Sequence, residues 1–334
     1  MPSVVIIKLG AVGDVLRTSY LINAFNKDFD YTVTWITSEA SKDILTNNPH
    51  INKILIFNKD ILPSNTDILI CLEDKKEFVV AASKISANKV IGSYINANDN
   101  LEYTDDVSEW FDMGIISKYG LERANTLKKE NNKSFNEIFT NSLSIKIDDI
   151  QPKVYFKEKT ELSKPNSKSL KIGLNLFAGN RWPSKELKQS DSQKLIDAMS
   201  SYLVANNINY TMTLSCDDSS SEKANYIIGD RDIKVINTNN NISEYSNHVR
   251  KCDFFITTDS LGMHLAIANN IRHIAFFNPT SAVEIDNFNS GVKVISQSSG
   301  YCSYEPYAKY DKTLWKNVFN QWITEVEQFI LSNK

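Results

Sequence analysis

The sequence predicts an α/β protein with two parallel, doubly wound sheets. Short apolar runs alternate with segments of helical periodicity along most of its 334 residues, an order that places helices on both faces of a parallel sheet. The alternation occurs twice, and a polar stretch with few apolar residues, 157–168, separates the two series. We therefore expect two Rossmann-like domains, at 1–165 and 166–313, followed by a C-terminal helix over 314–334.

In the first series the run at 4–9 reads as a continuous apolar strand, as is typical of a strand covered on both faces. The run at 4–9 meets a short glycine turn, after which Val15, Leu16 and Leu21 share one helical face. Further strands are expected at 31–37, 53–57, 67–72 and 89–92, and helices at 14–26, 39–46 and 75–86. Residues 96–144 depart from this pattern and have two interpretations: a solvated helix pair or a helical elaboration that shapes a binding cleft.

The second series contains six apolar runs and five helical segments. Strands are expected at 171–176, 209–214, 233–236, 253–257, 273–277 and 292–295, and helices at 187–206, 221–228, 243–251, 261–269 and 314–331. Such folds bind ligands at domain interfaces and at the carboxyl ends of their strands. Polar side chains that directly follow a strand are therefore the candidates for a site.

Composition excludes several classes of function. The formal charge is −3 and 42% of residues are hydrophobic, so neither a disordered chain nor a general nucleic-acid binder is expected. No apolar run approaches the roughly 18–20 residues of a membrane helix, and the start, MPSVVIIK, lacks signal-peptide features. The four scattered cysteines and four histidines lack ligand spacing. We expect a cytoplasmic protein with free thiols and no bound metal.

The first candidate loop, KLGAVGDVLRT at 8–18, follows the first strand. It is neither a G-x-G-x-x-G fingerprint nor a Walker A loop. Gly10 and Gly13 let the backbone approach a ligand closely, and Arg17 follows in the same segment. Asp14 has two interpretations: it is the N-cap of the next helix, or its carboxylate accepts a proton from a hydroxyl nucleophile.

Two further loops follow strands of the second series. In GLNLFAGNRWPSKE at 173–186, Arg181 and Lys185 either bind a diphosphate or belong to a solvated basic loop. Asp259 and Ser260 either cap a helix or stand beside its phosphate-binding N–H groups. One helical turn later, His264 is a core residue or a hydrogen-bond donor to a sugar or phosphate.

Weaker signals come from two other strand ends. Thr280 belongs to NPTS at 278–281, which by itself reads as an ordinary turn. Asp217 and Glu222 follow the expected strand at 209–214, and either carboxylate can accept a hydrogen bond from a ribose hydroxyl.

Four such loops in this order resemble glycosyltransferase family 9, the ADP-heptose:lipopolysaccharide heptosyltransferases. Residues 8–16 fit the family's K-x-G-x-x-G-D-[VIL]-[LI] opening, and 259–266 fit its D-[ST]-x-x-x-H-[LI]-A helix start. Residues 179–183 resemble its G-x-x-[KR]-x-W-P loop with a shorter spacing, and 277–280 resemble its F-G-P-T turn with asparagine in place of glycine. The chain also departs from the common D-[ST]-G-P-x-H form, because Leu261 and Gly262 stand in its middle.

The resemblance implies the GT-B fold: two Rossmann-like domains facing a cleft, with acceptor on the first and nucleotide sugar on the second. The final helix is then expected to pack back on the first domain. The implied reaction is inverting transfer of heptose or a similar sugar from a nucleotide-diphosphate sugar, ADP-heptose first, to a hydroxyl of a lipopolysaccharide-core or other surface-glycan acceptor. No cofactor or metal is obligatory. Peripheral contact with the cytoplasmic face of the inner membrane is compatible with such an acceptor.

Carried over by motif, Asp14 is the general base, and Gly10, Gly13 and Arg17 form the acceptor-side loop. The donor-binding set is Gly179, Asn180, Arg181, Lys185, Asp259, Ser260, His264 and Thr280. Two alternatives stay open: a nucleotide-sugar epimerase or hydrolase on the same fold, and a non-catalytic nucleotide- or glycan-binding protein.

Overall fold

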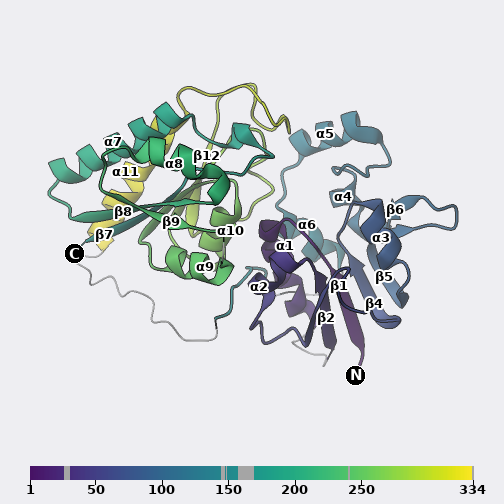
Figure 1. The fold of residues 1–334 in the computed structure, drawn as a ribbon. Helices are drawn as coiled ribbons and strands as arrows, with labels where there is room; N and C mark the ends of the chain where they lie inside the picture. The colour runs from purple at the N-terminus through teal and green to yellow at the C-terminus, as the bar shows by residue number, and fades with distance from the viewer. Residues whose placement is uncertain (26–30, 144–146, 148, 157–168, 240, 333–334) are drawn as a thin grey trace. The chain divides into compact units, whose positions relative to one another are not determined.

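The chain forms two compact α/β units in a computed structural model that describes residues 1–25, 31–143, 147, 149–156, 169–239 and 241–332 (Figure 1). By internal contacts, the first unit is Met1–Lys157 with Val283–Asp286, and the second is Glu158–Ala282 with Asn287–Lys334. The expected linker at 157–168, and with it the expected boundary at 165, lies outside the described residues.

The first unit contains a six-stranded sheet in the order β3-β2-β1-β4-β5-β6. All neighbours are parallel except β5 and β6, which form an antiparallel pair that the sequence analysis did not anticipate. The central strand β1 pairs with β2 on one side and β4 on the other, so the chain order reverses at β1, where α/β sheets bind ligands. The strands are β1 (Ser3–Ile7), β2 (Thr32–Thr37), β3 (Lys53–Ile56), β4 (Asn65–Cys71), β5 (Ser86–Ile95) and β6 (Leu101–Tyr103).

The helices of the first unit are short. The helix expected at 14–26 begins as α1 (Val12–Thr18) and continues as a 3-10 segment, Ser19–Phe25. Within 96–144, α5 (Gly120–Glu130) buries only Ala124 and is therefore largely solvated. The remaining helices are α2 (Lys42–Leu45), α3 (Lys76–Ala82), α4 (Ser108–Phe111) and α6 (Phe135–Ser142).

The second unit contains an all-parallel sheet in the order β12-β11-β10-β7-β8-β9. All six expected strands are confirmed, and the central strands β7, β10 and β11 are almost wholly buried, as their apolar runs predict. Its switch point is β7, between β8 and β10. The strands are β7 (Leu170–Asn175), β8 (Tyr210–Cys216), β9 (Ile233–Asn237), β10 (Phe254–Thr258), β11 (His273–Phe277) and β12 (Gly291–Ile295).

The C-terminal helix α11 (Leu314–Ser332) belongs to the second unit. Its buried side chains, among them Trp322 and Val326, join the second unit's core and contact α7 and β12. The other helices are α7 (Gln189–Ala205), α8 (Ser221–Ile228), α9 (Ile242–Arg250) and α10 (Leu261–Ala268). No helix among the described residues is long and apolar enough to cross a membrane.

The buried ring of His273 makes the second unit sensitive to acid. The ring packs so tightly on Gly291 that a Cβ there would lie 2.5 Å from it, and Nδ1 lies 2.9 Å from the Ile271 carbonyl oxygen. Burial lowers the pKa of His273 to about 4, against about 6.5 in an unfolded chain. Below about pH 6.5 the histidine therefore binds a proton in the unfolded chain but not in the folded protein. The free energy of unfolding falls as a result.

We expect His273 alone to remove about 2 kcal/mol of unfolding free energy between pH 7 and pH 5. Urea denaturation of the wild type and of His273→Leu at both pH values checks this. The variant should be less stable at pH 7 but should lose less on acidification. Equal losses in the two proteins would show that His273 ionises normally in the folded state.

Candidate active site

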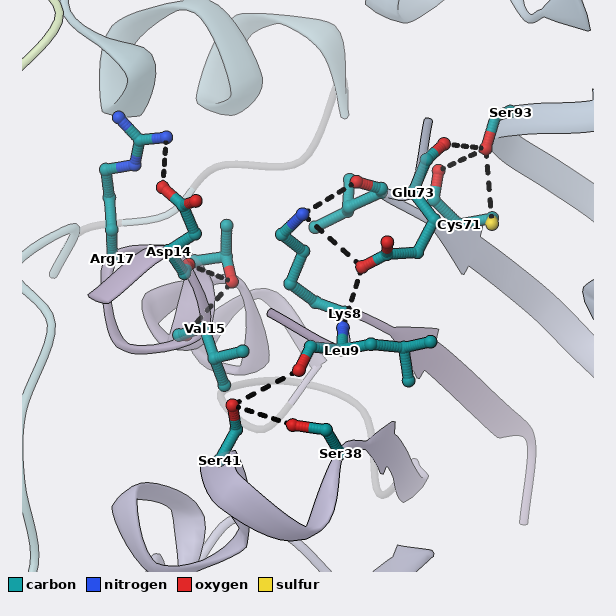
Figure 2. A network of polar contacts seen from close by, with 12 residues as sticks. Lys8, Leu9, Asp14, Val15, Arg17, Ser38, Ser41, Cys71, Glu73 and Ser93 are labelled. Carbon is teal, nitrogen blue, oxygen red and sulfur yellow. Dashed lines mark hydrogen bonds and ion pairs between the residues drawn. The ribbon is translucent and has the colours of Figure 1, made fainter. Parts of the chain in front are cut away.

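Asp14 lies in the first turn of α1, at the carboxyl edge of the first unit's sheet (Figure 2). The helix begins at Val12 with Ala11 as its N-cap, so the interpretation of Asp14 as the N-cap is wrong. Its side chain is 40% exposed, and Arg17 Nη2 donates to Asp14 Oδ1 at 2.8 Å. This ion pair orients the carboxylate on the helix, and a general base must be positioned in this way.

Arg17 is held in place by the helices that follow β6. Its guanidinium carbon lies 4.6 Å from the ring centre of Phe135 and 5.4 Å from that of Trp110. The side chain is only 13% exposed, so these cation–π contacts act in a partly desolvated setting where they are strongest. The helical segment between 96 and 144 therefore supports the partner of Asp14, a role that its sequence did not reveal.

Glu73 is a second carboxylate at this edge, and the sequence analysis missed it. It follows β4, is 4% exposed, and its Oε1 accepts from the Leu9 backbone N–H at 2.7 Å (Figure 2). Lys8 Nζ lies 3.3 Å from the same oxygen. Burial raises the pKa of Glu73, and Lys8 opposes this shift. The available signal was its position directly after the apolar run at 67–72.

In the second unit, four predicted residues form one cluster around Asp259. Lys185 Nζ lies 2.6 Å from Asp259 Oδ2, and the Thr280 hydroxyl donates to the same oxygen at 2.7 Å. Burial acts to raise the pKa of Asp259, but Lys185, Thr280 and His264 together hold it below its ordinary value. The Thr258 hydroxyl donates to the Lys185 carbonyl at 2.5 Å, which ties the loop after β7 to the end of β10.

A pocket of about 220 Å³ lies at the carboxyl ends of β7, β8 and β10. It brings together Gly179, Ser260 and Asp217 from the predicted set. Asp217 is also a capping residue, since its Oδ1 accepts from the Ser220 backbone at 2.9 Å and hydroxyl at 2.6 Å. The lining is Asn175, Phe177, Ala178, Gly179, Cys216, Asp217, Ser220, Thr238, Tyr245, Ser260, Leu261 and Gly262.

Asn175 and Gly262 were missed by the sequence analysis. Asn175 ends β7, and its Nδ2 donates to the Ser260 hydroxyl at 2.6 Å. A Cβ on Gly262 would lie 2.6 Å from both Asn175 Nδ2 and the Tyr245 hydroxyl. A larger residue at 262 would therefore displace the side chains that line the pocket.

Three predicted residues belong neither to this pocket's lining nor to the cluster around Asp259. Asn180 and Arg181 are exposed in the loop after β7, and Arg181 lies 5.8 Å from the ring centre of its neighbour Trp182. Glu222 is exposed on the first turn of α8. Within the described part of the chain, no group of three or more His, Cys, Asp or Glu is placed to hold a metal ion. The Asp-x-Asp pair at 230–232 lies in the turn between α8 and β9.

Two α/β units with largely parallel six-stranded sheets, each with polar side chains at the carboxyl ends of its central strands, match the GT-B fold. The chain belongs to glycosyltransferase family 9 (heptosyltransferase), whose family model matches residues 141–312, more than half of its length. The resemblance inferred from the loop motifs is confirmed, and the protein is an enzyme of the glycosyltransferase class.

Solved structures share the fold over nearly the whole chain. A glycosyl transferase family 9 protein from Veillonella parvula has a TM-score of 0.71 at 15% identity, covering 99% of this chain and 97% of its own. E. coli heptosyltransferase WaaC with ADP has a TM-score of 0.61 at 14% identity, and the match covers 99% of this chain and 100% of WaaC. TibC of enterotoxigenic E. coli, described as iron-containing and dodecameric, has a TM-score of 0.57 at 11% identity. The match covers 98% of this chain and 77% of TibC. No curated protein matches the chain in sequence.

Proposed function

We propose that this enzyme is an inverting, metal-independent glycosyltransferase that moves heptose or a similar sugar from a nucleotide-diphosphate sugar to a hydroxyl of a surface glycan. ADP-heptose is the proposed donor, and a lipopolysaccharide-core glycolipid is the proposed acceptor. The observation that carries this proposal is the Asp14 carboxylate, partly exposed and ion-paired to Arg17 at the carboxyl edge of the sheet. WaaC, which shares the fold, is described with bound ADP.

The proposed reaction is a single displacement. The acceptor hydroxyl gives its proton to Asp14 while its oxygen attacks the anomeric carbon, and the carbon–oxygen bond to the diphosphate breaks. The nucleoside diphosphate leaves with the bonding electron pair. Because the oxygen attacks the face opposite the leaving group, the configuration at the anomeric carbon inverts. Positive charge from Lys185 and Arg181, together with the N–H groups at the start of α10, stabilises the departing diphosphate.

The donor is proposed to bind the second unit, with Asp217 accepting from a ribose hydroxyl and Ser260, His264 and Thr280 near the sugar and phosphates. The pocket beside β7 supports this, because it contains the N-terminus of α10 and the polar groups that such a ligand needs. Glu222, which lies outside the pocket lining, is the weaker ribose candidate. The acceptor is proposed to bind the loop of Gly10, Gly13 and Arg17 in the first unit. We also propose a cytoplasmic location with peripheral membrane contact.

Product analysis tests the proposed reaction. The enzyme is incubated with ADP-heptose and EDTA, with and without a deacylated core acceptor, and products are analysed by mass spectrometry and NMR. We expect a glycosylated acceptor with inverted anomeric configuration and ADP, formed only when the acceptor is present. Free heptose or an epimerised donor without acceptor would favour a hydrolase or epimerase, and loss of transfer in EDTA would refute metal independence.

A further inference from the structure

Glu73 binds the strand that leads to Asp14. Leu9 follows the central strand β1, and its N–H donates to Glu73 Oε1 at 2.7 Å. The Ser93 hydroxyl in β5 donates to the Glu73 carbonyl oxygen at 2.6 Å, and Lys8 Nζ donates to the neighbouring Leu72 carbonyl at 3.2 Å. Figure 2 shows these groups converging where β1, β4 and β5 end. The Glu73 backbone is therefore fixed by Ser93, and its carboxylate by the Leu9 N–H and by Lys8 Nζ, 3.3 Å from Oε1.

Leu9 is held by side chains directly before the turn that leads to Asp14. Its N–H is bound by Glu73, and its carbonyl accepts from the Ser41 hydroxyl at 3.2 Å. The next residue, Gly10, has no heavy atom within 4 Å of the place where a Cβ would stand, and α1 begins without a side-chain cap. The position of the turn between Leu9 and α1 thus depends on how firmly Leu9 is held.

The ladder between the strands does not require this buried charge. β1 and β4 already pair in parallel from Val4–Ile68 to Ile7–Cys71, and the Leu72 N–H continues the ladder to the Ile7 carbonyl at 3.0 Å. Burying a carboxylate is costly unless it is paired and hydrogen-bonded. A neutral side chain would serve a purely structural role at lower cost, so the charge points to a function at this edge.

We propose that Glu73, supported by Lys8, is a positioning residue: it fixes Leu9 and the turn after it, and thereby places the Asp14 carboxylate for proton transfer. The inference rests on the proposed role of Asp14 as general base. A misplacement of about 1 Å can cost on the order of 100-fold in rate, so release of Leu9 should lower kcat without changing donor binding.

The same sheet offers a matched control at the opposite ends of the same two strands. Asp67 Oδ2 accepts from the Ser3 N–H at 2.7 Å and from its hydroxyl at 3.0 Å. Asp67 therefore joins the start of β4 to the start of β1, as Glu73 joins their ends, and both bonds span 64 residues. Asp67→Ala removes an equivalent contact far from Asp14.

Steady-state kinetics of Glu73→Ala, Glu73→Gln and Asp67→Ala test the proposal. We expect kcat to fall about 10- to 100-fold in Glu73→Ala, with the donor KM within about twofold of wild type. Glu73→Gln, which keeps an acceptor for the Leu9 N–H, should recover most of this loss. Asp67→Ala should keep the wild-type kcat below its melting temperature.

Unchanged kcat in Glu73→Ala, or an equal fall in Asp67→Ala, would overturn the proposal. If Glu73→Ala does not fold, Lys8→Met/Glu73→Leu replaces the ion pair by apolar groups and carries the same expectation. Asp14→Asn, assayed in parallel, separates the two hypotheses. If Asp14→Asn is inactive while Glu73→Ala turns over normally, only the positioning role fails; if Asp14→Asn is fully active, the proposed base fails and the positioning role with it.

Discussion

Asp14→Asn is expected to lower kcat by about 10²- to 10⁴-fold, the contribution typical of one positioned general base. Asparagine keeps the size of the side chain and can still accept a hydrogen bond from Arg17, but it cannot accept the proton of the attacking hydroxyl. Initial rates of ADP release with saturating acceptor measure the effect. The melting temperature should change little, because the Asp14 side chain is 40% exposed.

Donor binding separates loss of the base from loss of the fold. The stabilisation of Asp14→Asn by ADP in a thermal-shift assay should equal that of the wild type, since a ligand that binds only the folded protein raises its stability. Glu39→Gln removes an exposed carboxylate of the same unit, ion-paired to Lys59 at 2.9 Å, and should retain full activity. An Asp14→Asn variant as fast as this control would refute the assigned base.

Lys185→Met is expected to lower the unfolding free energy by about 3–5 kcal/mol, the usual cost of removing one partner of a buried ion pair. The two side chains are only 14% and 12% exposed, and their charged atoms lie 2.6 Å apart, so loss of Lys185 leaves the buried Asp259 carboxylate without its ion-pair partner. The pKa of Asp259 is lowered in the fold, so the contribution of the pair is present at neutral pH and is lost as pH falls through that pKa. Urea denaturation at pH 7 measures it.

A double variant distinguishes the structural from the functional role of Lys185. In Lys185→Met/Asp259→Asn no buried charge remains, and the Thr280 hydroxyl can still donate to the asparagine oxygen, so most of the lost stability should return. Affinity for ADP should stay low in both variants if Lys185 binds the diphosphate. If the double variant has restored stability and wild-type affinity for ADP, Lys185 stabilises the fold and does not bind the diphosphate.

The order of strands and loops follows from the sequence because each strand of a parallel sheet is buried on both faces and must be apolar. The same rule explains why the polar residues after these runs, Asp14 and Asp259 among them, lie at the edges where ligands bind. The antiparallel pair of β5 and β6 was missed because β6 has only three residues, none of them buried, and so shows no apolar run.

The sequence by itself determined the α/β class, the two series of strands, the family and most of the candidate loops, since these depend on periodicity and on local motifs. Only the tertiary structure decided that Asp14 is not a helix cap, that Arg17 rests on Phe135, and that α11 joins the second unit's core. Glu73 belongs to this second group, because its partner Leu9 is 64 residues away. Contacts between distant segments arise from the packing of whole elements, and no local pattern in the chain encodes them.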